Sequence, residues 1–538
     1  FIYETASSIA AFSLERFVAA SLMKTRMLNL MTVALMSTTV IYGQTSQAPV
    51  RSHVERFSSP ETRAGLAETE ATGKLKTNPN DADALNARAL ARMRFGRYKE
   101  AAEDLRRAVT LKPTSADFQA NLGYVLWKLG QPLEAINAER AALKLDEKNF
   151  TAHYQLGRFL LRMGEQQQVR EAATHLRRAL EIDPRSFEVR FELLAAYRAL
   201  NDPAQALAQL NVLQDARPSD ARVTYIRGLL ASDRGDLKAA TNDFREALRI
   251  DPALVGAWQD LGIAYLKQQH WPEAVESFAE ITRRQPDSAD AAYFHALSLF
   301  NARRDAEAET EVRRTLRLEA GAAAAHTLLG IILFTRSGPI PEARDALAQA
   351  VALDPNSFDA YYYLGRVQGD MKDYAGAIES LRRATALNPK QQFARFLLGY
   401  ALEVSGQLDA ALLEYKTLVE IDSASAVGQM GLGAISLKQG RIDEALAALE
   451  RAVNLNPTLF EAQWALGLAL ARAKRDAEAI EALKKATALA PGRPDGHYQL
   501  GLALQRSGRK EEAAREFEIA KRITTEFRTG NVNVNENK

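Results

Sequence analysis

The chain repeats itself with a period of 34 residues, and this period limits its fold more than any other feature of its 538 residues. Pro79 and Pro113 are 34 residues apart, and so are Pro355 and Pro389. A unit of this length cannot bury a core by itself, so such units must stack on one another. With the proline at position 32, thirteen units, numbered here as repeats 1 to 13, begin at Ala82, Ala116, Phe150, Phe187, Ala221, Val255, Ala289, Ala323, Phe358, Gln392, Ala426, Phe460 and Pro494.

Three positions of the repeat hold nearly constant kinds of side chain. Position 20 is alanine in all thirteen repeats, position 8 is glycine in ten, and position 24 is large and apolar in twelve, with Glu139 as the exception. Positions 4, 7, 8 and 11 would share one face of a first helix, and positions 20, 24 and 27 one face of a second. Small residues at positions 8 and 20 would let the two helices approach closely. The pattern predicts one helix pair in each repeat.

The ends of these helices are also marked. Proline at position 32 cannot continue the second helix. Position 15, between the helices, is glycine in seven repeats, as expected for a helix stop: Gly96, Gly130, Gly164, Gly235, Gly406, Gly440 and Gly508. Repeat 3 has three extra residues around 166–168, and repeat 8 has one near Pro339. We expect both insertions to lie in the turn between the two helices.

This pattern resembles the tetratricopeptide-repeat (TPR) family. The Trp-Ala-Leu-Gly of residues 464–467 and the Tyr-Tyr-Leu-Gly of residues 362–365 are close to the signature of the family's first helix. The resemblance covers residues 82–527 and implies an all-α fold, a TPR superhelical solenoid of about thirteen helix-turn-helix repeats. We expect residues 61–81, with Leu66 and Leu75, to form a leading helix that caps the first repeat, and residues 528–538 to be a disordered tail.

Residues 23–43 have the layout of a secretory signal peptide. Lys24 and Arg26 precede an uncharged, mostly apolar run, and Gln44 follows a small residue. The run is short for a membrane-spanning helix and is diluted by polar residues. We therefore expect cleavage before Gln44, export to the periplasm or cell envelope, and no stable membrane span afterwards. The alternative is an uncleaved anchor through residues 27–43.

The segments on either side of this run have a simpler interpretation. Residues 44–60 are polar, contain two prolines and are expected to be a linker. The chain begins with Phe1 rather than methionine. We interpret residues 1–22 as non-native upstream read-through, with a longer genuine amino terminus as the rival interpretation.

Composition argues against several classes of function. Lys and Arg total 69 and Asp and Glu total 67, so there is no broad basic field and no nucleic-acid partner is expected. The chain has no cysteine, which excludes disulfides and thiol catalysis. His153, His326 and His497 share position 4, where the first helix packs, and are interpreted as core residues. We expect no catalytic residues, no metal site and no cofactor, and hence no enzyme.

In TPR proteins, positions 2, 5, 9 and 12 of the first helix face a concave groove that binds partners, so the resemblance implies a groove here. Position 5 is aromatic in eight repeats: Tyr154, Phe191, Tyr225, Tyr293, Tyr362, Phe396, Trp464 and Tyr498. Either aromatic residues are simply common at this position in the family, or these side chains line a groove for an apolar peptide. Repeats 3 to 5 add Arg158, Arg198 and Arg222, which suit an acidic or extended peptide. The alternative is that these arginines pair with local acids such as Glu188.

The expected function is that of a non-catalytic scaffold or adaptor that binds other proteins in this groove. One alternative is a structural subunit of a cell-envelope assembly for pili, secretion or polysaccharide export. A second is the substrate-docking subunit of a split enzyme. Ile519, Ile523 and Phe527 are spaced four apart on the last expected helix, which predicts a docking or self-association surface there. The alternative is a frayed last turn.

Overall fold

The computed structural model describes residues 60–336, 338 and 340–529. The predicted read-through, signal peptide and linker lie outside these described residues, apart from Pro60, and so does most of the predicted tail. Within the described ranges, no helix combines the length and the apolar character needed to cross a bilayer.

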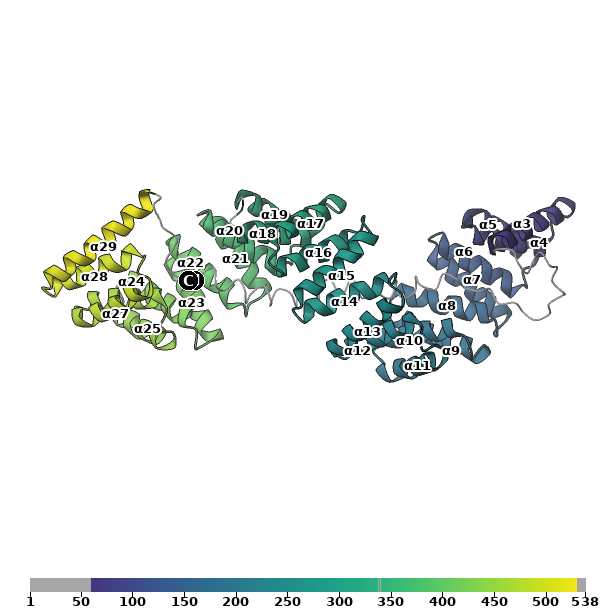
Figure 1. Ribbon diagram of the computed structural model, residues 1–538, viewed down its shortest axis with the longest axis horizontal. Helices are drawn as coiled ribbons and strands as arrows, with labels where there is room; N and C mark the ends of the chain where they lie inside the picture. Colours follow the sequence, from purple (N-terminus) through teal and green to yellow (C-terminus); the bar gives the residue numbers. More distant parts are fainter. Residues whose placement is uncertain (1–59, 337, 339, 530–538) are drawn as a thin grey trace. The chain divides into compact units, whose positions relative to one another are not determined.

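The described residues form helices α3 to α29 and no strand, which confirms the all-α repeat fold (Figure 1). A leading helix, α3 (Pro60–Thr77), packs on α4. The first helices of the thirteen repeats are α4 (Ala82–Arg94), α6 (Ala116–Lys128), α8 (Phe150–Met163), α10 (Phe187–Ala199), α12 (Ala221–Asp233), α14 (Val255–Lys267), α16 (Ala289–Asn301), α18 (Ala323–Thr335), α20 (Phe358–Asp370), α22 (Gln392–Val404), α24 (Ala426–Lys438), α26 (Phe460–Arg472) and α28 (Pro494–Arg506). The second helices are α5 (Tyr98–Leu111), α7 (Pro132–Leu145), α9 (Gln166–Ile182), α11 (Pro203–Ala216), α13 (Leu237–Ile250), α15 (Trp271–Arg284), α17 (Asp305–Leu318), α19 (Ile340–Leu353), α21 (Tyr374–Leu387), α23 (Leu408–Ile421), α25 (Ile442–Leu455), α27 (Asp476–Leu489) and α29 (Lys510–Thr529).

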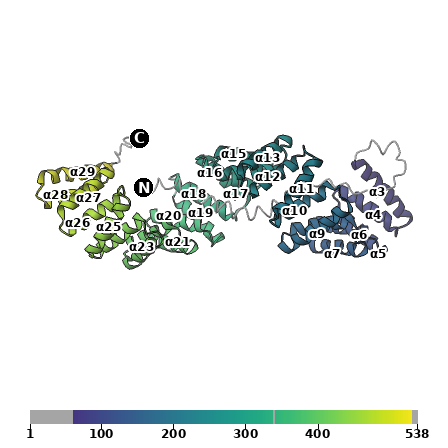
Figure 2. The ribbon, with the colours of Figure 1, turned by 90° about the horizontal axis from the view of Figure 1, so that it is seen from below.

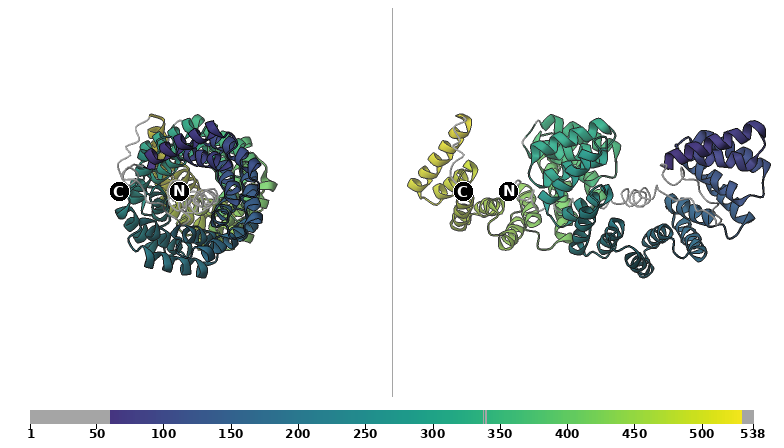
Figure 3. Two further views of the ribbon diagram at one scale, coloured as in Figure 1. Left: turned by 90° about the vertical axis from the view of Figure 1, so that its right-hand side faces the viewer. Right: turned by 45° about the vertical axis from the view of Figure 1, so that its right-hand side comes forward.

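These helices belong to two compact units. One contains α3 to α15 and ends at Pro286, and the other begins at Asp287 and contains α16 to α29. Within each unit the two helices of a repeat pack against each other, and each second helix packs against the first helix of the next repeat (Figures 2 and 3). Most neighbouring first helices of a unit are also in contact.

Glycine at position 8 makes room for the side chain at position 24 of the same repeat. A Cβ atom on Gly262 would lie 2.7 Å from the ring of Phe278, and one on Gly467 would lie 2.5 Å from Leu483. The position 20 alanines are buried in all thirteen repeats. The two helices therefore meet with a large side chain of the second helix seated on the bare backbone of the first.

The turn between the two helices needs a left-handed residue at position 15. All seven glycines predicted as helix stops have φ between 72° and 80°. Five other repeats adopt the same conformation without glycine, at Asn201, Gln269, Arg303, Lys372 and Lys474, with φ between 56° and 63°. The backbone geometry of this turn is therefore common to these repeats, and glycine is only the residue that adopts it at least cost.

In seven repeats the side chain at position 4 links the repeat to the one before it. Trp258 Nε1 donates to the carbonyl of Pro252 at 3.0 Å, six residues earlier, at position 32 of the preceding repeat. Six further repeats make the same bond, at distances of 2.8 to 3.2 Å, through His153, Arg190, His326, Arg395, Gln463 and His497. The Nε2 atoms of the three histidines must donate in these bonds, because a carbonyl oxygen can only accept. These histidines therefore link repeats in addition to filling the core.

Four details differ from the prediction. The leading helix covers residues 60–77 instead of 61–81, since proline suits a first turn, and its Leu66 is exposed. The extra residues 166–168 of repeat 3 are not in the turn, because they lengthen α9 at its amino end. The last helix continues to Thr529, beyond the predicted limit of 527.

Candidate partner-binding face

The side chains at positions 2, 5, 9, 12 and 13 of the first helices are called here the first-helix face. The structure places most of its predicted aromatic side chains in contacts within the protein. Tyr154, Phe191, Tyr225, Tyr293 and Tyr362 are buried. Phe396 and Trp464 are half-buried, and Tyr498 is 50% exposed. Position 5 therefore changes from a packing position to a solvent-accessible one between repeat 3 and repeat 13.

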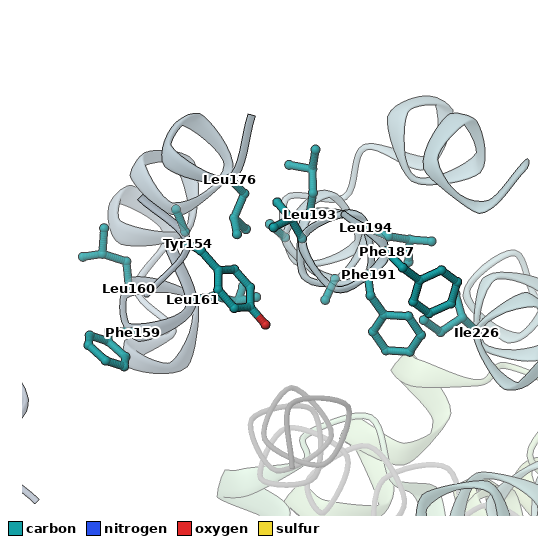
Figure 4. Packing of buried hydrophobic residues seen from close by; sticks show 14 of the residues in the cluster. Tyr154, Phe159, Leu160, Leu161, Leu176, Phe187, Phe191, Leu193, Leu194 and Ile226 are labelled. Atoms are coloured by element: carbon teal, nitrogen blue, oxygen red, sulfur yellow. The ribbon is translucent and has the colours of Figure 1, made fainter. Parts of the chain in front are cut away.

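The buried rings pack between neighbouring first helices. Figure 4 shows Tyr154 on α8 and, on α10, Phe191 beside Phe187 near Ile226 of α12. The Tyr225 hydroxyl donates to Asp260 Oδ2 of the next repeat at 2.6 Å. Burial raises the pKa of Tyr225 well above its ordinary value. These rings stabilise the stacking of repeats and offer little surface to a ligand.

Tyr293 and Tyr362, in the second unit, are buried with their rings against aromatic neighbours on their own helices. Tyr293 lies edge-on to Phe294, with ring centres 5.5 Å apart, and Tyr362 stacks on Phe358 at 5.7 Å. Arg366 lies over the ring of Tyr362, 5.6 Å from its centre. Burial raises the pKa of both tyrosines above the ordinary value.

The three arginines predicted for an acidic peptide are each paired with acids of this chain. Arg158 Nε lies 3.1 Å from Glu192 Oε1, and both side chains are buried. Burial opposes the charge of Arg158, but the attraction of Glu192 leaves its pKa above the ordinary value. Arg198 Nε lies 2.7 Å from Asp233 Oδ2, in the next repeat. These contacts tie neighbouring first helices together.

Arg222 makes a third link of this kind. Its guanidinium lies 2.9 Å from Asp220 Oδ2 and 3.3 Å from Glu188 Oε2, the acid named from the sequence. It also lies over the rings of Phe187 and Phe191, 5.2 Å and 5.3 Å from their centres. The structure therefore brings the predicted aromatic and arginine residues of repeats 3 to 5 together, but as contacts between repeats.

Two cations that were not predicted lie beside this region, at position 13 of repeats 2 and 3. The pKa of Lys128 is lowered by burial and by the charges of Arg158 and Arg162. The pKa of Arg162 is lowered by burial and by Arg158, although Glu192 opposes the shift. Burial is the first cause of both shifts, and the charges that add to them belong to groups that hold the repeats together.

Helix α22 is different, because its part of the first-helix face is apolar and open. Phe393, Tyr400 and Val404 are 40%, 49% and 43% exposed, and Phe396 between them is half-buried. Sequence reasoning named only Phe396. The missed signal was that repeat 10 alone has large apolar residues at positions 2, 5, 9 and 13 together.

The histidine side chains of repeats 3 and 13 form structural pairs with other side chains of the protein. The Nδ1 atoms of His153 and His175 are joined at 2.9 Å, and His497 Nδ1 lies 2.6 Å from Glu516 Oε2. Burial and the neighbouring His153 lower the pKa of His175. No group of three metal-ligating side chains was found among the described residues.

The carboxy-terminal surface is only partly described. Ile519 and Ile523 are half-buried on α29, and the side chain of Phe527 lies outside the described residues. Self-association through this helix stays a prediction.

Comparison with known proteins identifies the family of these repeats. The family description "Tetratricopeptide repeat" matches residues 121–187, 295–358, 332–391, 364–426 and 432–494, and in a second form residues 165–230 and 231–299. The description "TPR repeat" matches residues 91–130. The chain belongs to the tetratricopeptide-repeat family.

Two relatives of this TPR protein are similar to it over only a small part of their own length. Superkiller complex protein 3 of Mus musculus is 28% identical over 199 residues, which cover 36% of this chain and 12% of the mouse protein. Cellulose synthase operon protein C of Pseudomonas fluorescens is 27% identical over 251 residues, 43% of this chain and 19% of that protein. The solved structure of YrrB, described as a TPR protein with an unusual peptide-binding site, is 25% identical, with a TM-score of 0.34, and covers 35% of this chain and 97% of YrrB. The TPR protein thus spans less than a fifth of the length of either relative.

Proposed function

We propose that this TPR protein is a non-catalytic scaffold that binds partner proteins on its first-helix face. The observation that supports this function is the exposure of large aromatic side chains on that face at Tyr400 and Tyr498, 49% and 50% exposed. Aromatic rings supply much contact area for little loss of side-chain entropy, and they are enriched where proteins bind one another. Repeat stacking elsewhere has already buried the equivalent rings, so the open ones define where a partner can dock.

Photo-crosslinking tests this assignment. A photo-reactive amino acid at Tyr498 should capture proteins in the cells that make this chain. The same amino acid at Leu413, on the second helix of repeat 10 and 62% exposed, is the matched control and should capture few. Equal capture at both positions, or none at Tyr498, would contradict binding on the first-helix face.

A second candidate is a structural subunit of an assembly for polysaccharide export. The name of the Pseudomonas relative, cellulose synthase operon protein C, favours it. Crosslinked partners that synthesise or export a polysaccharide would select this candidate. Soluble partners with no such role would leave the general scaffold.

Export from the cytoplasm is part of the proposal and rests on the pattern of residues 23–43, with Lys24 and Arg26 before an uncharged run. The protein recovered from an envelope fraction should begin near Gln44 when its amino terminus is sequenced. Recovery of residues 23–43 on protein from the cytoplasm would contradict export by cleavage, and recovery of these residues in membranes would favour the anchor.

A further inference from the structure

Two histidines of repeat 3, His153 on α8 and His175 on α9, share one hydrogen bond. Their Nδ1 atoms lie 2.9 Å apart. The ring centres are 5.2 Å apart, so the two nitrogens lie between the rings and point at each other. His153 is buried and His175 is half-buried. A hydrogen bond between two ring nitrogens needs one nitrogen that carries a hydrogen and one that is bare.

The backbone carbonyl of Glu147 decides which nitrogen carries the hydrogen. It lies in the turn between α7 and α8, 3.0 Å from His153 Nε2. A carbonyl oxygen only accepts, so His153 Nε2 donates to it. In the neutral ring the Nδ1 atom of His153 is then bare, and it accepts from Nδ1–H of His175. The Nε2 atom of a neutral His175 is consequently bare as well.

Three ionisable side chains act on His175, from α7, α8 and α9. Glu171 Oε1, on the same helix as His175, lies 3.8 Å from His175 Nε2 and 2.8 Å from Arg140 Nη2 on α7. Burial is the first cause of the lowered pKa of His175, a charged His153 and Arg140 add to it, and Glu171 opposes it. The contacts thus run from the carbonyl of Glu147 through both histidines to Glu171 and Arg140, and they join repeat 3 to repeat 2 at two points.

We propose that the His153–His175 pair is an acid-sensitive contact that holds repeat 3 closed and opens when both rings are protonated. One proton is accepted without loss, because it binds to Nε2 of His175, which faces Glu171. The second proton can go only to Nδ1 of His153. Two N–H groups would then face each other across 2.9 Å, and two positive charges would lie in a partly buried site near Arg140. Helices α8 and α9 must separate locally to relieve this, whatever partner the protein binds.

Repeat 13 contains the opposite arrangement and is an internal reference. His497 also occupies position 4, and its Nε2 atom lies 3.1 Å from the carbonyl of Pro491. Its Nδ1 atom lies 2.6 Å from Glu516 Oε2, and a carboxylate accepts from a nitrogen that carries a hydrogen. A charged ring therefore fits in repeat 13, whereas in repeat 3 the partner of Nδ1 is a second histidine. Acid should loosen repeat 3 and leave repeat 13 closed.

Amide hydrogen exchange on the full chain tests this proposal, with His175→Asn as the matched variant. The side-chain amide of asparagine can donate to a bare Nδ1 of His153, and after turning over it can accept from Nδ1–H. The variant therefore tolerates both protonation states of His153 and should fold like the wild type. A comparison of the two proteins at each pH cancels every effect of pH that they share.

The expected direction follows from proton uptake. An exposed histidine takes up a proton near pH 6.5, and the pKa of His175 in the folded chain is lower. The stabilisation by the pair is therefore complete above pH 6.5 and is lost as the pH falls below it. Between pH 7.5 and 5.5 the opening of α8 and α9 should increase about tenfold or more in the wild type. It should change little in His175→Asn, and α28 and α29 should not open in either protein.

The tautomers of the two rings are a second, independent measurement. The chain has seven histidines, so nitrogen-15 labelling of histidine gives a simple spectrum, and the His175→Asn variant assigns one of its signals. At pH 7.5 the hydrogen of His153 should be on Nε2 and that of His175 on Nδ1. Hydrogen on Nε2 of both rings would overturn the proposal, because the shared bond would not exist. Equal opening of repeat 3 in wild type and His175→Asn at pH 5.5, or opening of repeat 13 together with repeat 3, would overturn it too.

Discussion

At the residue scale, Glu139 is a carboxyl group where the other repeats place a large apolar side chain. It is fully buried, and within the described residues neither of its oxygens has a hydrogen-bond partner. A Cβ atom on Gly123 would lie 2.5 Å from Glu139 Oε1, so the carboxyl occupies the space that leucine or phenylalanine fills in other repeats. Burial raises its pKa well above 4.5. The Glu139 carboxyl is therefore protonated and uncharged in the folded protein.

This burial predicts a pH dependence of stability. The unfolded chain releases the Glu139 proton near pH 4.5, while the folded chain keeps it. The contribution of Glu139 to stability is therefore most favourable below pH 4.5 and falls by about 1.4 kcal/mol per pH unit above it, until the folded group also ionises. Glu139→Gln removes this slope, and Glu139→Leu should stabilise repeat 2 by about 1–3 kcal/mol at pH 7. Urea unfolding from pH 4 to 8 measures both, and parallel profiles for wild type and Glu139→Gln would show that the carboxyl is not buried.

A second prediction at this scale concerns the bare backbone at position 8. Gly262→Ala would force a Cβ atom to within 2.7 Å of the Phe278 ring and should destabilise the protein by about 1–3 kcal/mol. Gly369→Ala is the control, because that glycine is helical and has no atom within 4 Å of the added Cβ. It should stabilise by about 0.5–1 kcal/mol, since alanine favours a helix. The two substitutions should shift the urea midpoint in opposite directions, and a shift in the same direction would refute the packing account.

At the scale of the helix pair, the turn at position 15 is strained where it lacks glycine. Lys372 has φ of 63° in repeat 9, and Gly406 has φ of 77° at the same position of repeat 10. A side chain in this region costs roughly 1–2 kcal/mol, and glycine gives back part of that as entropy of the unfolded chain. The turn is thus held by the helices on either side of it.

Lys372→Gly should therefore stabilise the protein by about 0.5–1 kcal/mol, and Gly406→Ala should destabilise it by about 1 kcal/mol. The two sites are in neighbouring repeats of one unit, so each is a control for the other. Thermal melting of the two variants measures both changes in stability. A loss of stability in Lys372→Gly would mean that the lysine side chain contributes more than its backbone strain costs.

At the scale of the whole molecule, each repeat contacts mainly its neighbours, so stability should be local. Ala240→Leu places three extra carbon atoms at a buried position 20 in repeat 5 and should destabilise its surroundings by about 1–3 kcal/mol. Amide hydrogen exchange should become faster in α10 to α15 and stay unchanged in α3 to α5 of the same unit. A uniform rise from α3 to α15 would show that this unit unfolds as one cooperative block.

The sequence by itself determined where the helices are. Every first helix begins at the residue where a repeat was predicted to begin, from Ala82 to Pro494. This succeeded because most helix limits are marked locally, by proline at position 32 after most second helices and by glycine at position 15 after seven first helices. The lengthened α9 was missed, since polar glutamines suit a turn and a first helical turn equally well.

Only the tertiary structure decided which of the predicted site residues face water. Arg158 finds Glu192 34 residues away, and Tyr225 finds Asp260 35 residues away, because stacking brings equivalent positions of neighbouring repeats together. The same stacking left Tyr400 and Val404 uncovered, although their neighbours on the other side of α22 are buried. The exposure of a side chain depends on whether side chains of the adjacent repeats cover it. The packing distance between repeats decides this, and the 34-residue pattern does not specify that distance.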